Sequence, residues 1–146
     1  MTTIYRAAED TELFVGAHFA HTREEAESYT NNPGFGGPVV WEMVVNGSIL
    51  RVDGLRELAK AAIDLGVEPP AYESYNDYGE VTYTPGNWGT LYDAWMDQGF
   101  DQEFKAIEGD GALLDALNAS EYEWVSFDEP AIGDESRVST TYRYLG

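Results

Sequence analysis

The chain has 146 residues, of which 27 are acidic and 8 are basic, so its formal net charge is −19 at pH 7. A field this negative repels nucleic acid phosphates, and no basic stripe opposes it, which argues against direct binding to DNA or RNA. The chain lacks cysteine, so it can form neither a disulfide nor a thiolate metal site. No signal-peptide pattern and no apolar run of membrane-spanning length is present, so we expect a cytoplasmic protein without a membrane partner.

The negative charge has three interpretations that the sequence leaves open. In the first, the acidic residues imitate nucleic acid phosphates and so bind a basic partner. In the second, they adapt the protein to a salty cytoplasm, and in the third they only keep its surface soluble. Aromatic residues make up 14% of the chain and hydrophobic residues 43%, which is enough for a core. The length fits a single domain spanning residues 1–146.

The first 52 residues predict strands interrupted by one short helix. Hydrophobic patterns and turn residues place the elements in this order: strand 4–6, strand 13–20 bent at Gly16, helix 22–29, loop 31–38, strand 39–45 and strand 48–52. Thr22 and Glu25 have the spacing of a capping box. Asn46-Gly47 favours a type I′ turn, so the strands around it are expected to pair. Glu42 is the single acid of its strand and needs a partner if it is buried.

The rest of the chain predicts helices followed by two strands. The expected elements are helix 54–65, a tyrosine-rich loop at 71–86, helices between 87 and 117, and strands 122–127 and 137–145. Asp53 and Asn87 occupy N-cap positions, and Gly66 ends the first helix. Pro130 cannot donate a ladder hydrogen bond and is expected to stop its strand. This order of elements predicts an α+β fold with helices against a mostly antiparallel or mixed sheet.

The sequence contains none of the common catalytic motifs. It has no phosphate-binding glycine loop, no zinc-protease motif, no nucleophile elbow and no kinase signature. His18 and His21 are three residues apart across an expected strand end, so they need not face one site, and we predict no metal site. The loop tyrosines at 72, 75, 78 and 83 either stack on an aromatic ligand or cover the core.

Short segments near both ends of the chain follow an order known from one protein family. The segments are Tyr5-Arg6-Ala7 on the first strand, Ala17–Thr22 leading into a helix with Ala26 and Tyr29, Glu121–Phe127, and the final Thr140-Thr141-Tyr142. In this order the chain resembles the ADP-ribosyltransferase-like family of bacterial toxins, phage polyvalent-protein domains and an ADP-ribosylating anti-CRISPR protein. Residues 66–118 match none of its motifs.

The resemblance implies a fold and a cofactor. The fold would consist of two small, mostly antiparallel sheets forming a cleft, with several short helices around them, and the cofactor would be NAD. The chain would then be a mono-ADP-ribosyltransferase-like protein, encoded by a phage and directed in the host cytoplasm against a host defence or host enzyme. The residues that the resemblance assigns to cofactor binding are Tyr5, Arg6, His18, Phe19, Thr22 and Tyr29.

The chain departs from the family at the catalytic carboxylate. Many members carry an acid just before the last aromatic strand segment, where this chain has Thr140-Thr141-Tyr142. A carboxylate in a dry cleft stabilises the positive charge that develops on ribose as nicotinamide leaves. The nearby substitutes are Asp128, Glu129 and Glu135, although the first two also fit solvated turn residues. Arg6 likewise fits a strand-edge arginine that pairs with an acid. Retention of catalysis is therefore an open question.

A second function from another class also fits the sequence. An acidic mimic of nucleic acid would block a basic DNA- or RNA-binding host protein without catalysis. Such binding would weaken steeply as salt rises. An NAD-binding protein would instead be stabilised by NAD.

Overall fold

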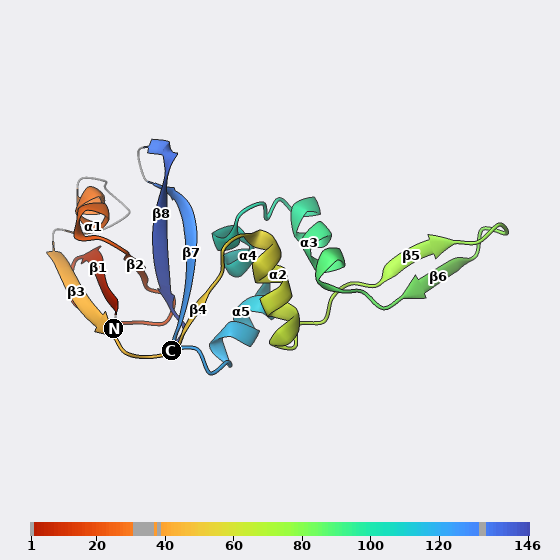
Figure 1. Ribbon diagram of the computed structural model, residues 1–146, viewed down its shortest axis with the longest axis horizontal. Helices are drawn as coiled ribbons and strands as arrows, with labels where there is room; N and C mark the ends of the chain where they lie inside the picture. Colours follow the sequence, from red (N-terminus) through yellow and green to blue (C-terminus); the bar gives the residue numbers. More distant parts are fainter. Residues whose placement is uncertain (1, 31–36, 38, 132–133) are drawn as a thin grey trace. The chain divides into compact units, whose positions relative to one another are not determined.

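The computed structural model describes residues 2–30, 37, 39–131 and 134–146 (Figure 1). Its fold class is α+β, as predicted, with five helices and eight strands in those ranges. The strands form a six-stranded and a two-stranded sheet. Contacts between residues divide the chain into two compact units, which are Met1–Val52 with Ser120–Gly146 (unit 1) and Asp53–Ala119 (unit 2). The two sheets belong to different units, and the cleft expected between them stays a prediction.

Unit 1 is built on the six-stranded sheet, whose strand order is β3-β1-β2-β8-β7-β4. Its elements are β1 (Thr2–Ala8), β2 (His18–Ala20), α1 (Arg23–Thr30), β3 (Val39–Val45), β4 (Ile49–Arg51), β7 (Trp124–Ala131) and β8 (Asp134–Tyr144). Neighbouring strands are antiparallel except β4 and β7, which run parallel. The opening and closing strands of the chain therefore share one sheet, with β2 between them (Figure 1).

The segment after Asn46-Gly47 does not return beside β3 as a hairpin, so that prediction is wrong. β3 and β4 lie at opposite edges of the sheet, and β4 pairs with β7. Ser48 accounts for this path. Its hydroxyl donates to the carbonyl of Glu121 at 2.7 Å, and its carbonyl accepts from the N–H groups of Glu123 and Trp124. The segment is thus bound to the start of β7.

Other strand boundaries also differ from the predictions, most clearly at Gly16 and at Pro130. The expected strand 13–20 is reduced to β2, because the chain turns at Gly16, whose φ is 92°. Pro130 does not end β7, which continues to Ala131 with an irregular register between the two residues. Proline is tolerated at such irregular positions. The loop predicted at 31–38 lies outside the described residues except for Gly37.

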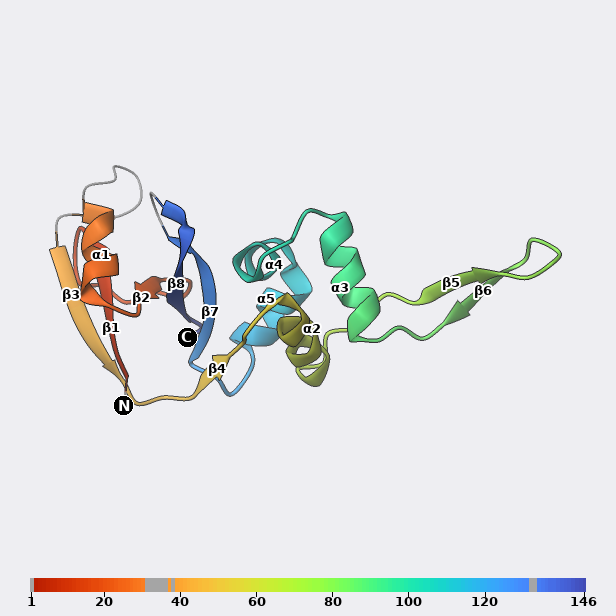
Figure 2. The ribbon, with the colours of Figure 1, turned by 45° about the horizontal axis from the view of Figure 1, so that its top comes forward.

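The aromatic core cluster of unit 1 lies on one face of its sheet, while Val125 and Phe127 are buried on the other. Ile4, Phe19 and Trp124 are buried in this cluster, and the ring of Phe19 packs edge-on against Trp41 at 5.1 Å and against Trp124 at 5.4 Å. Helix α1 packs against β1, β2 and β3 (Figure 2). It covers the other face, where its Arg23 lies 5.4 Å from the ring of Tyr5.

Unit 2 contains four helices and one hairpin within the described ranges. They are α2 (Leu55–Asp64), β5 (Tyr72–Tyr75), β6 (Val81–Thr84), α3 (Trp88–Asp97), α4 (Glu103–Gly109) and α5 (Gly111–Asn118). The tyrosine-rich segment predicted as a loop is thus a β-hairpin. Every helix of the described chain is too short or too polar to span a membrane.

The helix caps of unit 2 agree in part with the predictions. Asn87 caps α3: its side-chain oxygen accepts from the N–H groups of Gly89 and Thr90, and the Thr90 hydroxyl accepts from the Asn87 N–H. Asp53 does not cap α2, because the N-cap is Gly54 and the Asp53 N–H instead donates to the Glu57 carboxylate at 2.8 Å.

Asp110 joins two helices of unit 2. Its Oδ1 accepts from the N–H groups of Ala112 and Leu113 at 3.1 and 3.3 Å and so caps α5. Its Oδ2 accepts from the indole nitrogen of Trp95, in α3, at 2.8 Å. Trp95 is fully buried. One carboxylate therefore satisfies a helix end and a buried donor together.

We expect Asp110→Ala to destabilise unit 2 by about 2–4 kcal/mol. The lost cap costs about 1 kcal/mol, and a buried indole N–H left without an acceptor costs about 1–3 kcal/mol. Urea unfolding monitored by tryptophan fluorescence measures the change. Asp115→Ala, on the exposed side of α5, is the matched control and should change the midpoint little. Equal midpoints for the two variants would contradict this role of Asp110.

Candidate functional site

The register of the six-stranded sheet divides the predicted site residues between two faces. Side chains alternate along a strand, and residues paired across strands share a face. Arg6, Phe19 and Asp128 lie on one face, called here the Arg6 face. It also holds residues in register with them, namely Trp41, Tyr142, Ser126, Arg51 and Thr140. Tyr5 and Glu129 lie on the opposite face, with the side chain of His18.

Arg6 is a half-buried cation between two aromatic rings. Its Nη1 donates to the carbonyl oxygen of His18 at 2.8 Å. Its guanidinium carbon lies 5.0 Å from the ring centre of Phe14 and 5.9 Å from that of Phe19. Burial lowers the pKa of Arg6 and the charge of Asp10 opposes this, but arginine remains protonated. Among the described residues no carboxylate forms an ion pair with Arg6.

Two buried donors on the Arg6 face lack acceptors. Arg6 Nε and Trp41 Nε1 are buried atoms, and neither has a hydrogen-bond partner in the described part of the chain. The two residues are directly paired across β1 and β3. An unsatisfied buried donor costs about 1–3 kcal/mol, so such atoms call for a water or a ligand acceptor. Each donor therefore suits an oxygen acceptor on this face.

Asp128 is the predicted catalytic acid that lies on the Arg6 face. Its Oδ1 is 2.9 Å from Arg51 Nη2 and accepts from the Thr140 hydroxyl at 2.8 Å. Burial acts to raise the pKa of Asp128, but the hydrogen bonds from Arg51 and Thr140 and the charge of Arg51 outweigh it, so the pKa lies below its ordinary value. The carboxylate stays ionised at neutral pH, which suits charge stabilisation rather than proton donation.

Arg6 and Asp128 do not contact one another. Strands β2 and β8 separate β1 from β7, and three strand spacings of about 4.8 Å put roughly 14 Å between them along the sheet. Phe19 and Tyr142 are paired between them. Because Phe19 is buried, one ligand could reach both residues only if it were elongated and the side chains that cover Phe19 moved aside.

The predicted residues of the opposite face have structural contacts. Glu129 accepts from the Thr141 hydroxyl at 2.6 Å. The ring of His18 meets Phe127 edge-on at 6.3 Å, and its Nε2 is 3.3 Å from Arg143 Nη1. Because Asp128 and Glu129 are consecutive strand residues, they point to opposite faces and cannot act on one ligand.

The remaining predictions concern residues near α1 and β8. The Thr22 hydroxyl accepts from the Glu25 N–H at 3.2 Å, so Thr22 caps α1 as predicted and this role occupies its oxygen. The backbones of Tyr29 and Glu135 belong to α1 and β8, but the structure does not describe their side chains.

Glu42 is exposed and lies 3.7 Å from Arg23, so it is a surface acid rather than a buried one.

Sequence reasoning missed Trp41 and Arg51. Trp41 alternates with the core positions Met43 and Val45, so its face was predictable, but its pairing with Arg6 was not. Arg51 reaches Asp128 only because β4 and β7 are neighbours, and no local signal predicts that pairing. In the described ranges no three His, Asp or Glu side chains gather in a way that could hold a metal ion.

Comparisons with known proteins add no relative. No family model matches the chain, and neither a curated protein nor a solved structure matches it. The resemblance to ADP-ribosyltransferase-like proteins therefore stays a prediction from the sequence segments alone.

The lowered pKa of Asp128 predicts a pH-dependent contribution to stability. Ionised Asp128 stabilises the folded state above its unfolded-state pKa, about 3.9, and this is lost as pH falls through the lower folded-state pKa. Asp128→Asn should therefore cost stability at pH 7, and the cost should shrink as pH falls below the unfolded-state pKa. Because the pair is partly exposed, the cost should be about 0.2–1 kcal/mol.

Urea unfolding at pH 7, 5, 4 and 3 tests this expectation. Arg51→Gln provides the matched background, in which the effect of Asp128→Asn should shrink at neutral pH. A cost of Asp128→Asn that is the same at pH 3 and pH 7 would argue against ionic stabilisation.

Proposed function

We propose that this protein is an ADP-ribosyltransferase-like protein that binds NAD on the Arg6 face. The observation that carries the proposal is the pair of buried, unpartnered donors Arg6 Nε and Trp41 Nε1, which lie opposite one another on β1 and β3. Arg6 is also the residue to which the resemblance assigns contact with the nucleotide. Two N–H groups and a guanidinium suit the phosphate oxygens of a dinucleotide.

Phe14 is the residue that ligand binding would displace. It packs on the guanidinium of Arg6 and is itself 50% exposed. An adenine or nicotinamide ring is similar in size and shape and can occupy the same place over the cation. Moving an exposed side chain of a connecting segment costs little packing, so the guanidinium of Arg6 can exchange Phe14 for a ligand ring without disturbing the core.

Asp128 is the residue proposed to act in catalysis. Bound NAD would supply a ribose whose bond to nicotinamide breaks as positive charge develops on the sugar. An ionised carboxylate held by Thr140 on the same face stabilises such charge. Arg51 offsets part of that negative charge. The acceptor, a host protein of a phage-infected cell, follows from the resemblance alone.

NAD should raise the melting temperature of the parent protein. At ten times its dissociation constant NAD would stabilise the folded state by about 1.4 kcal/mol, a shift of about 3–6 °C. Arg6→Gln should lose the shift, and Trp41→Phe, which removes one donor and keeps a ring, should weaken binding several-fold. Arg56→Gln, whose guanidinium lies on Tyr92 in unit 2, is the control and should respond like the parent. A parent that does not respond to 10 mM NAD would disprove the proposal.

Release of nicotinamide from NAD tests the role of Asp128. We expect Asp128→Asn to lower the rate about 100-fold, because a group aimed at developing charge contributes on this scale. The variant should retain the NAD-dependent shift in melting temperature. Glu129→Gln, on the opposite face of the sheet, is the matched control and should retain the parent rate. Equal losses in the two variants would remove Asp128 from the mechanism.

A further inference from the structure

The β5–β6 hairpin of unit 2 buries none of its strand residues. All eight residues of the two strands are exposed, with Tyr75 69% and Tyr83 66% exposed. An isolated two-stranded hairpin is only marginally stable in water. Large apolar side chains gathered on an exposed element are typical of an interaction site.

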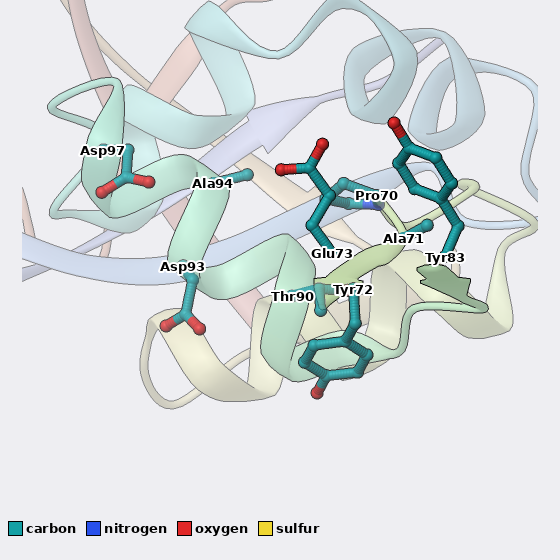
Figure 3. Close-up of a pocket in the computed structure, with 9 residues that line it drawn as sticks. All are labelled: Pro70, Ala71, Tyr72, Glu73, Tyr83, Thr90, Asp93, Ala94 and Asp97. Carbon is teal, nitrogen blue, oxygen red and sulfur yellow. The ribbon is translucent and has the colours of Figure 1, made fainter. Parts of the chain in front are cut away.

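The register of the hairpin brings its exposed side chains to one face. Glu73 pairs with Tyr83, and Tyr75 pairs with Val81, so these four residues share a face, called here the hairpin face. Figure 3 shows Glu73 and Tyr83 pointing to the same side, while Tyr72 points away. The hairpin face therefore combines two tyrosines, one valine and one carboxylate.

The tip of the hairpin is an ordered turn. The Asn76 side chain accepts from the N–H groups of Tyr78 and Glu80, both at 2.9 Å, and the Asn76 N–H donates to the Glu80 carbonyl at 3.0 Å. Gly79 supplies the positive φ of 78° that the turn needs. Tyr78 is held 89% exposed by this arrangement. A surface that is already ordered loses less conformational entropy when it binds.

A groove of about 470 Å³ lies at the base of the hairpin (Figure 3). The hairpin contributes Glu73 and Tyr83 to its lining, and α3 contributes Asp93 and Asp97, which are one turn apart. No ion pair engages these three carboxylates within the described chain. The groove is thus negatively charged and continuous with the aromatic hairpin face.

The chain segment that builds the groove carries acids and no bases, and the nearest cations, Arg56 and Lys60 of α2, lie over the rings of Tyr92 and Trp88 in α3. Between Lys60 and Lys105 there is no lysine, arginine or histidine, whereas nine residues are acidic. Carboxylates beside exposed aromatic rings match a guanidinium, which stacks on rings and pairs with carboxylates through its planar fork. A second copy of this chain would bring like charge to the surface and is disfavoured.

We propose that the hairpin face and its groove form a docking surface for an arginine-rich segment of a partner protein. Guanidinium groups stack on Tyr75 and Tyr83 and pair with Glu73, Asp93 and Asp97. This surface belongs entirely to unit 2 and does not depend on NAD binding, so either proposal can fail while the other stands.

The probe is fluorescein-labelled nona-arginine, with fluorescence anisotropy measured at 150 mM NaCl. Tyr75→Ser combined with Tyr83→Ser should weaken binding at least fivefold, and nona-lysine should bind the parent less tightly than nona-arginine because it stacks poorly. Because both tyrosines are exposed, the double variant should keep the parent's circular dichroism and melting temperature.

Two triple variants distinguish binding at the groove from attraction by the overall negative charge of the protein. Glu73→Gln with Asp93→Asn and Asp97→Asn removes three charges from the groove, and Glu9→Gln with Glu12→Gln and Glu24→Gln removes three exposed charges from unit 1. The first should weaken binding at least fivefold and the second less than twofold. Equal effects would show that peptide binding depends only on the net charge of the protein, and this would overturn the proposal. A dimer of this chain that dissociates in the tyrosine variant, measured by sedimentation equilibrium, would also overturn it.

Discussion

The pairing of β2 with both β1 and β8 is the interaction on which the Arg6 face depends. β2 has only three residues, of which Ala20 pairs with Tyr5 and all three pair with β8. These pairs join the opening and closing strands of the chain in one sheet. Phe19, at the centre of β2, is 1% exposed and packs against tryptophans of β3 and β7. Its burial stabilises the short strand that backbone pairing alone would hold weakly.

The register set by these pairs decides which functional side chains can work together. Arg6, Trp41 and Asp128 share a face, whereas Glu129 turns away from them. A shift of one residue in β1 or β7 would exchange the two sets, because side chains alternate along a strand. The chemical character of the face is thus a consequence of backbone pairing, and the ionised state of Asp128 depends in turn on the parallel pairing that brings Arg51 beside it.

The two units carry different kinds of surface. Unit 1 holds a half-buried cation, two unpartnered donors and an ionised carboxylate on one sheet face. Unit 2 presents exposed tyrosines and uncompensated acids on an ordered hairpin. A protein that modifies another protein needs both a cofactor site and a surface for its target. The proposed NAD site and the proposed docking surface would meet these two needs with separate parts of the chain.

Local chemistry in the sequence was enough to predict the α+β class, strand 39–45, and the caps at Thr22 and Asn87, because capping and periodicity depend on residues within a few positions. It also singled out Arg6, Phe19 and Asp128. The hairpin at 72–84 was missed, since each strand has only four residues and the proline and glycine residues around them favour a loop. The pairing of β4 with β7 and the ion pair between Arg51 and Asp128 were decided only by the tertiary structure. These partners are 77 residues apart in the chain, and only the packing of the whole sheet brings them together.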